Sequence, residues 1–266
     1  MLIIGEKING TLKKTAAAIA ARDATFIQEL AQRQAAAGAD ILDINAGTAS
    51  SSEPGDLVWL IDCVQAVVDI PLCLDSANPV ALKAGMEQVT QTPMVNSISG
   101  EASRLAGVLP LVARYHCPVI ALLLDDQGIP GDVERRLAIA ERILERTRQA
   151  GVPDEHIYID PLAMALSTKT EGALIALETI RCLHVTHPAV HFCCGLSNVS
   201  FGLPARSLIN QAFLAQALPA GLDAAIIDPL DRGLTNMLYA TELVLGRDRF
   251  CHNFTKAYRA GKIVIT

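Results

Sequence analysis

Short apolar runs alternate along this chain with longer segments in which apolar residues recur every three or four positions. The short runs are typical of strands buried on both faces, and the longer segments are typical of helices that cover a sheet. Eight strands are predicted on this basis, at Leu2–Gly5, Asp40–Ile44, Leu72–Leu74, Met94–Asn96, Val119–Leu124, Ile157–Ile159, His191–Gly195 and Ala224–Ile227. Eight helices are predicted between and after them, at Ala24–Ala37, Pro54–Val68, Pro79–Val89, Glu101–Tyr115, Asp132–Ala150, Glu171–His184, Arg206–Ala220 and Gly233–Leu245.

Strict alternation of strands and helices is typical of βα units with parallel strands. Eight such units close naturally into a single (β/α)₈ TIM barrel, which is the fold class that we expect. An open doubly wound sheet is the alternative, but the first turn, Gly5 to Gly10, does not have its Gly-x-Gly-x-x-Gly pattern. One domain is therefore predicted over residues 1–266, with residues 246–266 as a more basic, less periodic tail that packs under the barrel or reaches a neighbouring subunit.

Composition agrees with a large core in a protein that acts away from nucleic acid and membranes. Of the 266 residues, 51% are hydrophobic, 19% are charged and 4% are aromatic. The net charge of −6 and the lack of a basic arm argue against nucleic acid as a partner. The first residues do not resemble a signal peptide, and the longest uncharged segment, Cys182–Ala205, contains too many His, Pro and Gly residues to be a typical membrane span.

The seven cysteines are scattered and odd in number, so they do not indicate a disulfide framework. A reducing cytoplasm fits them best. Cys193 and Cys194 are adjacent, so we expect them to point to opposite faces of a strand, and no cluster has the spacing of a zinc site. No metal is predicted.

Polar residues follow every predicted strand, and in a barrel these positions converge on the carboxyl-terminal mouth, where such folds have their active sites. In chain order they are Glu6 and Asn9, Asp43 and Asn45, Asp75 and Ser76, Asn96 and Ser97, Asp125 and Asp126, Asp160, Ser197 and Asn198, and Asp228. No catalytic lysine and no histidine are expected at a strand end, and Ser197 with Arg206 would make only a weak phosphate site. Carboxylates and carboxamides suit a flat heterocycle with several N–H donors, such as an amino-pyrimidinone.

Six blocks in this chain resemble the pterin-binding methyltransferases, above all the methyltetrahydrofolate:corrinoid/iron–sulfur protein methyltransferases. They start at Gly5, Leu42, Leu72, Val95, Tyr158 and Gly195, and read GEKING, LDIN, LCLDS, VNS, YIDPL and GLSNVS. They cover nearly the whole chain in the family's order. Relatives in this family work in O-demethylase and in methylamine- or betaine-type corrinoid systems. The resemblance implies a TIM barrel that is usually a homodimer.

The resemblance also implies roles for individual residues. Asp75, Asn96 and Asp160 would hold the pyrimidine edge of the pterin, and Asn198 would lie near N5, the atom that carries the methyl group. Gly195, Ser197 and Arg206 would line the same pocket, while Glu6 and Asp43 would contact the pterin or brace their neighbours. In one departure from the family pattern, Phe201 stands where the compared member has a glutamine. The resemblance therefore does not specify whether a polar side chain contacts the ligand there, nor which methyl donor is preferred.

The expected reaction moves the N5 methyl group between methyltetrahydrofolate and the Co(I) corrinoid of a partner protein. Asn198 is the expected catalytic residue, because a hydrogen bond that it donates to N5 would strengthen in the transition state. Three other functions remain open, namely a dihydropteroate synthase, a non-catalytic pterin-binding module and a barrel that acts on phosphorylated sugars. Asp75, Asn96 and Asp160 could instead cap helices, Asn198 could be a turn residue, and Asp228 is expected to be one.

Overall fold

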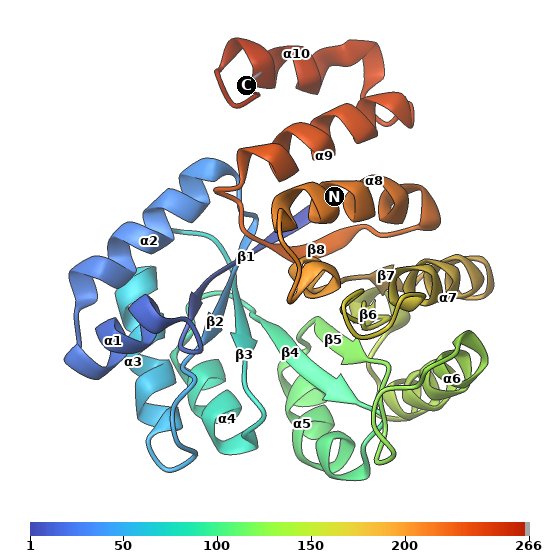
Figure 1. Cartoon of the computed structure of the whole chain (residues 1–266). Helices are drawn as coiled ribbons and strands as arrows, with labels where there is room; N and C mark the ends of the chain where they lie inside the picture. The colour runs from blue at the N-terminus through green and yellow to red at the C-terminus, as the bar shows by residue number, and fades with distance from the viewer. Residues whose placement is uncertain (264–266) are drawn as a thin grey trace.

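A computed structural model describes residues 1–263, in which eight strands form one parallel sheet (Figure 1). The strands are β1 (Leu2–Asn9), β2 (Ile41–Asn45), β3 (Leu72–Asp75), β4 (Met94–Ser99), β5 (Val119–Leu122), β6 (Ile157–Asp160), β7 (His191–Phe192) and β8 (Ala224–Ile227). Their order is β7-β6-β5-β4-β3-β2-β1-β8. The barrel closes between the two outer strands, where the Ile226 amide donates to the carbonyl of Cys194 at 2.9 Å. The predicted TIM barrel is confirmed.

Helices surround the strands on the outside of the barrel (Figure 1). They are α1 (Lys13–Ala21), α2 (Ala24–Ala37), α3 (Glu53–Gln65), α4 (Pro79–Gln88), α5 (Ala102–Tyr115), α6 (Val133–Gln149), α7 (Gly172–Thr186), α8 (Arg206–Ala220), α9 (Arg232–Val244) and α10 (His252–Arg259). Three short 3₁₀ turns add η1 (Asp154–His156), η2 (Leu196–Ser200) and η3 (Arg249–Cys251). All eight predicted helices are present, while α1 and α10 were not predicted.

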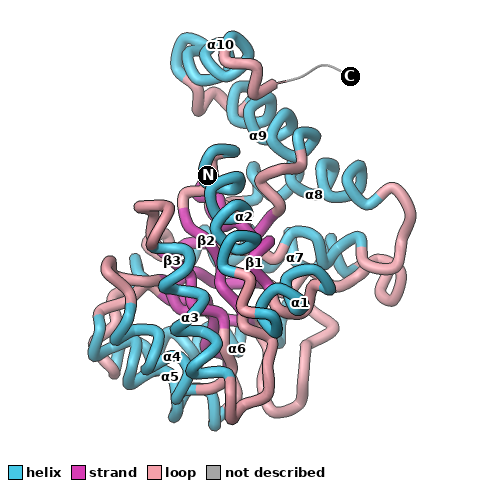
Figure 2. The backbone as a smooth tube through the Cα atoms, turned by 90° about the vertical axis from the view of Figure 1, so that its left-hand side faces the viewer, coloured by secondary structure: helices cyan, strands magenta, loops and turns pink. Residues whose placement is uncertain are grey.

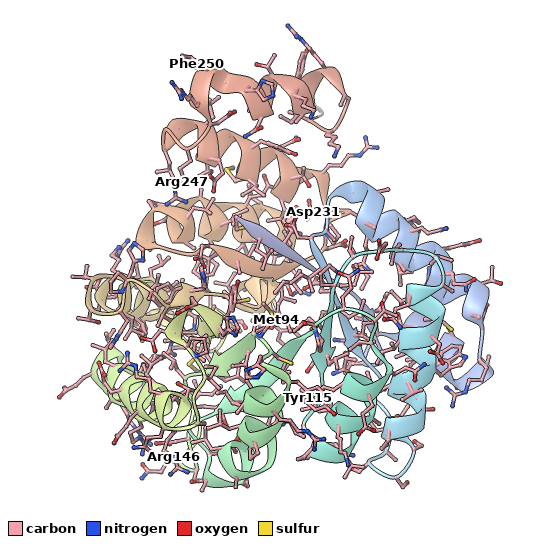
Figure 3. All side chains as sticks on the ribbon, turned by 180° about the vertical axis from the view of Figure 1, so that it is seen from behind. Met94, Tyr115, Arg146, Asp231, Arg247 and Phe250 are labelled. Carbon is pink, nitrogen blue, oxygen red and sulfur yellow. The ribbon has the colours of Figure 1, made fainter. Side chains whose placement is uncertain are left out.

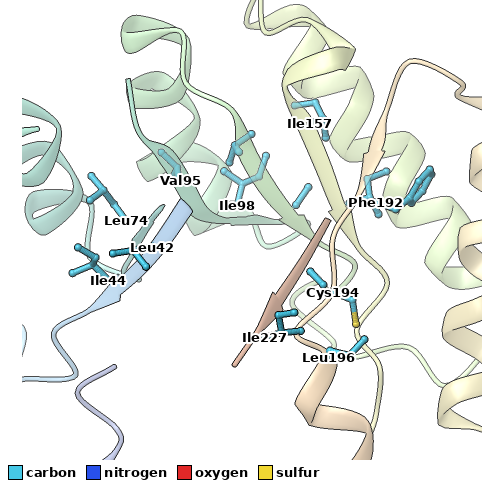
Figure 4. Packing of buried hydrophobic residues seen from close by; sticks show 14 of the residues in the cluster. Leu42, Ile44, Leu74, Val95, Ile98, Ile157, Phe192, Cys194, Leu196 and Ile227 are labelled. Carbon is cyan, nitrogen blue, oxygen red and sulfur yellow. The ribbon is translucent and has the colours of Figure 1, made fainter. Parts of the chain in front are cut away.

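The sheet separates two apolar layers. Outward-facing strand residues such as Leu42, Val95 and Phe192 pack against the helices and form the main core (Figure 4). A smaller cluster fills the barrel interior and consists of Ile4, Ile41, Cys73, Met94, Ile120, Cys193 and Ala224. Cys193 belongs to the inner layer and Cys194 to the outer one, as the alternation of side chains along a strand predicts.

The same alternation places the polar strand ends on the inner face. Positions two residues beyond the interior cluster point into the barrel again, but they lie nearer the carboxyl end of each strand. They are Glu6 after Ile4, Asp43 after Ile41, Asp75 after Cys73, Asn96 after Met94, Asp160 after Tyr158 and Gly195 after Cys193. The apolar cluster therefore forms the floor of a polar mouth.

The chain after α9 lies at the opposite end of the molecule from this mouth (Figure 2). Arg247 and Phe250 are at that end, well away from Met94 in the barrel (Figure 3). Residues of α9 and α10 line a cavity there of about 410 Å³, together with Met1, Ile3 and Asp40 at the amino ends of β1 and β2. Residues 264–266 of the predicted tail lie outside the described part. Within the described part, helices fall short of the length and apolar character that a membrane crossing needs.

Candidate active site

Two pairs of carboxylate and amide side chains connect β2, β3 and β4 at the mouth. The Asn96 amide donates to Asp43 at 3.3 Å, and the Asn45 amide donates to Asp75 at 2.8 Å. Burial, and then the nearby charge of Asp75, raise the pKa of Asp43 well above its ordinary value, and burial also raises the pKa of Asp75. The Oδ1 atom of Asn45 is buried without a hydrogen-bond partner. A ligand with several N–H donors would satisfy this acceptor and reduce the repulsion between the two carboxylates.

Asp160 ends β6 and connects that strand to the segment after β7. Its carboxylate accepts the Leu162 amide at 2.7 Å and the Gly195 amide at 3.4 Å. Burial raises the pKa of Asp160 to about 6, although the two amides and the cation of Arg136 lower it. Asp160 is therefore ionised near neutral pH and still within reach of protonation in a mildly acidic medium.

The turn η2 presents Asn198 to solvent directly above the end of β7. The backbone of this turn is fixed by a bond from the Asn198 amide to the Gly195 carbonyl at 3.2 Å. A Cβ atom on Gly195 would lie 2.9 Å from Nδ2 of Asn198, so a larger residue there would displace the amide. Gly195 is needed here for space, since its φ of −67° suits any residue.

Arg206 braces the outside of this turn. Its guanidinium donates to the Ser197 carbonyl at 2.7 Å and to the Ser200 hydroxyl at 3.0 Å, and it lies over the ring of Phe201 at 5.9 Å. Phe201 is 66% exposed. The guanidinium thus stabilises the loop that carries Asn198, and its hydrogen bonds run to that loop.

On the same side of the mouth, β1 continues to Asn9 and brings Glu6 and Lys7 into the site beside this turn. Burial raises the pKa of Glu6, and Ser197 lies 3.4 Å from its carboxylate. Lys7 pairs with Asp228 at 2.9 Å, so a lysine does lie at this end of the barrel, with its charge already paired. The predicted strand ended at Gly5, whereas β1 continues to Asn9. The pairing of β1 with β2 is irregular between Gly5 and Ile8, so the second half of the strand does not continue the apolar run of the first. Asp228 accepts the Leu230 amide at 3.0 Å, as expected of a turn residue.

The structure places other residues at the caps of the helices that follow these strand ends. The residues at the N-caps of α4, α5 and α7 are Asn78, Glu101 and Glu171. Asp75, Asn96 and Asp160 therefore do not cap the helices that follow them. Asn45 joins this cluster two residues after Asp43, on the inner face that its position in the strand predicts. Within residues 1–263, no group of His, Cys, Asp and Glu side chains is arranged to hold a metal ion.

The barrel is closed, and its mouth carries hydrogen-bond acceptors above an apolar floor. These features are those of a TIM-barrel protein that binds a small polar ligand at the carboxyl ends of its strands. The chain belongs to the family of pterin binding enzymes, whose pattern it matches over residues 5–228. A methylcorrinoid:tetrahydrofolate methyltransferase of Eubacterium limosum is 40% identical over 99% of this chain and 98% of its own length. The methionine synthase of Mycobacterium leprae is 33% identical over 85% of the chain, which corresponds to 20% of that longer protein. The expected membership in the pterin-binding methyltransferases is confirmed.

Solved structures of dihydropteroate synthases share the fold. The enzyme of Xanthomonas albilineans in complex with 7,8-dihydropteroate superimposes with a TM-score of 0.68 at 21% identity, over 92% of both chains. The Yersinia pestis dihydropteroate synthase has a TM-score of 0.69 at 15% identity, over 92% of this chain and 93% of its own. At such identities the likeness concerns the fold alone.

Proposed function

We propose that this chain methylates N5 of tetrahydrofolate with the methyl group of a corrinoid that a partner protein carries. The observation that supports this proposal best is the acceptor cluster of Asp43, Asn45, Asp75 and Asn96, which opens on the same barrel mouth as the exposed Asn198. The name of the Eubacterium limosum relative gives the same donor and acceptor. The whole chain, residues 1–266, would act as one domain, in which the described part of the tail, residues 246–263, lies beside the amino ends of β1 and β2.

Binding of the pterin follows from hydrogen-bond chemistry. The pyrimidine edge of a pterin presents amino and ring N–H donors beside one carbonyl. Asp75 and Asp160 would accept from those donors, and Asn96 would donate to the carbonyl. The unpartnered Oδ1 of Asn45 adds a further acceptor. Asp43, which accepts from Asn96, would hold that amide in place.

The reaction must release one proton. A new N5–CH₃ bond forms while the cobalt–carbon bond breaks, cobalt keeps the electron pair as Co(I), and N5 loses its hydrogen as H⁺. The corrinoid supplies the methyl group and is the leaving group. Asp160, whose pKa is about 6, has a protonation equilibrium suited to taking up this proton through water, since its carboxylate would accept from the pyrimidine edge and not from N5. Asn198 would hold N5 in position by its amide.

A matched pair of variants tests the catalytic role of Asn198. Asn198→Ala should lower the kcat of methyl transfer by about tenfold or more and leave the affinity for tetrahydrofolate within about threefold. Asn253→Ala, an exposed amide on α10, should leave both unchanged. A kcat for Asn198→Ala within about threefold of wild type, equivalent to ~0.7 kcal/mol, would refute the role. Tetrahydrofolate binding without any methyl transfer by the wild type would instead indicate a non-catalytic module.

The partner protein would dock over the mouth. Four large apolar side chains are exposed on loops or helix starts that follow β1, β3, β5 and β7, namely Leu12, Val80, Ile129 and Phe201. They surround the only end of the barrel from which a bulky corrinoid can approach Asn198. Phe201→Ala should therefore raise the KM for the corrinoid protein and leave the KM for tetrahydrofolate unchanged.

A homodimer and a cytoplasmic location complete the proposal. Exposed apolar residues also occur on the outside of the adjacent helices α7 and α8, at Leu174, Val185 and Leu208. A self-complementary contact would cover them. Leu208→Glu should convert a dimer into a monomer in light scattering, whereas a wild-type monomer would refute the dimer. Seven free cysteines, five of them buried, suit a reducing compartment.

A further inference from the structure

A buried arginine lies behind the mouth, in a position that the proposed reaction does not explain. Arg136 on α6 has no exposed surface. In the described part of the chain, the hydrogen bonds of its guanidinium run to main-chain carbonyl oxygens. A buried cation is costly unless its surroundings compensate it, so such a residue needs a structural or functional reason.

Two of these hydrogen bonds run to the turn that positions Asp160. One guanidinium nitrogen, Nη1, donates to the carbonyls of Pro161 and Leu162, the latter at 3.2 Å. Leu162 has a φ of 61°, a left-handed conformation that costs a leucine about 1 kcal/mol or more. This conformation accompanies the bond from the Leu162 amide to the Asp160 carboxylate at 2.7 Å. Arg136 thus binds the carbonyl oxygens of Pro161 and Leu162, while the Leu162 amide of the same turn binds the carboxylate of Asp160.

The other nitrogens of the guanidinium connect this turn to a second loop. Nε and Nη2 donate to the carbonyl of Pro130 at 3.2 and 3.1 Å. Pro130 lies in the loop between β5 and α6, beside the exposed Ile129. One side chain therefore links the loops that follow β5 and β6, which are neighbours around the mouth.

We propose that Arg136 is a positioning residue, which holds the turn of residues 160–162 in the strained form that directs Asp160 into the pterin site. This inference rests on the proposed function. The charges near Asp160 agree with it. The Arg136 cation favours the ionised form of Asp160, while the nearby thiols of Cys193 and Cys194 have pKa values raised by burial and stay neutral.

The first test is thermodynamic and needs no ligand. A double-mutant cycle combines Arg136→Met with Asp160→Asn and measures the free energy of unfolding at several pH values. We expect the two changes to be non-additive above pH 6, because the first removes the cation that favours the ionised carboxylate of Asp160. Additive effects at every pH would overturn the inference. If Arg136→Met does not fold, Arg136→Gln, which also removes the charge but keeps N–H donors, takes its place in the cycle.

The second test separates positioning from simple destabilisation. Arg136→Met should weaken tetrahydrofolate binding by about tenfold or more, because the carboxylate is misplaced. Adding Leu162→Gly relieves the left-handed strain and should restore part of that affinity. Arg135→Met, the adjacent residue that pairs with Asp125 at 3.0 Å, should leave affinity unchanged. Equal losses for Arg136→Met and Arg135→Met, or no rescue by Leu162→Gly, would overturn the inference, whereas a wild type that binds no tetrahydrofolate would refute the proposed function.

Discussion

The ionised carboxylate of Asp160 is predicted to lower the free energy of unfolding of the ligand-free protein, although the same group is needed to bind the pterin. Burial raises its pKa from an ordinary 3.8 to about 6. The folded state therefore binds the proton more tightly than the unfolded state does. This contribution to stability is fully present below pH 3.8 and is lost as the pH rises through 6. The difference between 3.8 and about 6 corresponds to roughly 3 kcal/mol at pH 8.

Asp160→Asn removes this ionisation. Asparagine keeps an acceptor for the Leu162 amide, but its NH₂ group faces the Gly195 amide, which now approaches Asp160 at 3.4 Å. Loss of that long hydrogen bond costs about 1 kcal/mol. We therefore expect Asp160→Asn to be more stable than wild type by about 1–2 kcal/mol at pH 8 and equal or less stable at pH 4.5. Tetrahydrofolate binding should be lost or severely weakened.

Urea unfolding of both proteins at pH 4.5, 6 and 8 measures this effect. Asp154→Asn is the control, because the Arg148 guanidinium beside Asp154 lowers the pKa of that carboxyl. Its replacement should destabilise the protein slightly above pH 4, by at most about 1 kcal/mol, since the pair is exposed. The reasoning is refuted if Asp160→Asn destabilises the protein as much at pH 8 as at pH 4.5.

Three further variants test the rest of the site. Gly195→Ala should lower kcat by about tenfold at near wild-type stability, because its Cβ displaces the Asn198 amide, and single-turnover kinetics measures this. Asn45→Leu removes the donor to Asp75 and the unpartnered acceptor, so titration calorimetry should find weaker tetrahydrofolate binding by about tenfold. Arg206→Ala loosens the turn from outside, so kcat should fall while the Kd for tetrahydrofolate stays within about threefold, and a larger rise in Kd would show direct ligand contact.

The sequence predicts this fold well because short apolar runs and longer segments of helical period alternate along the whole barrel. The predicted bounds of α2 and α8 agree with the structure, and Gly38 ends α2 in a left-handed conformation, as such a glycine commonly does. Helix α1 was missed because it precedes α2 in the same βα unit, where strict alternation predicts one helix, and because it begins without a side-chain cap. Helix α10 was missed because Ala257 is its one buried residue.

Part of the candidate site could also be predicted from the sequence, and part could not. Inward-facing strand ends such as Asp75 and Asp160 are predictable, because the fold fixes where strands end and which face they present. Contacts between distant side chains are not, so neither the Lys7–Asp228 pair nor the hydrogen bonds of Arg136 could be read from residue spacing. Arg206 shows the limit, since a motif places it beside the pocket but only the coordinates show that its hydrogen bonds run to the turn.

A single-turnover experiment tests the central claim most directly. The protein is mixed with tetrahydrofolate and a corrinoid carrying an isotopically labelled methyl group, either as free methylcobalamin or on its carrier protein. The absorbance of Co(I) and the label on N5 are followed together. The account predicts that both products appear at one rate and in equal amounts, and that Asn198→Ala slows both alike. Absence of labelled methyltetrahydrofolate with either donor, or condensation of a pterin pyrophosphate with aminobenzoate, would contradict it.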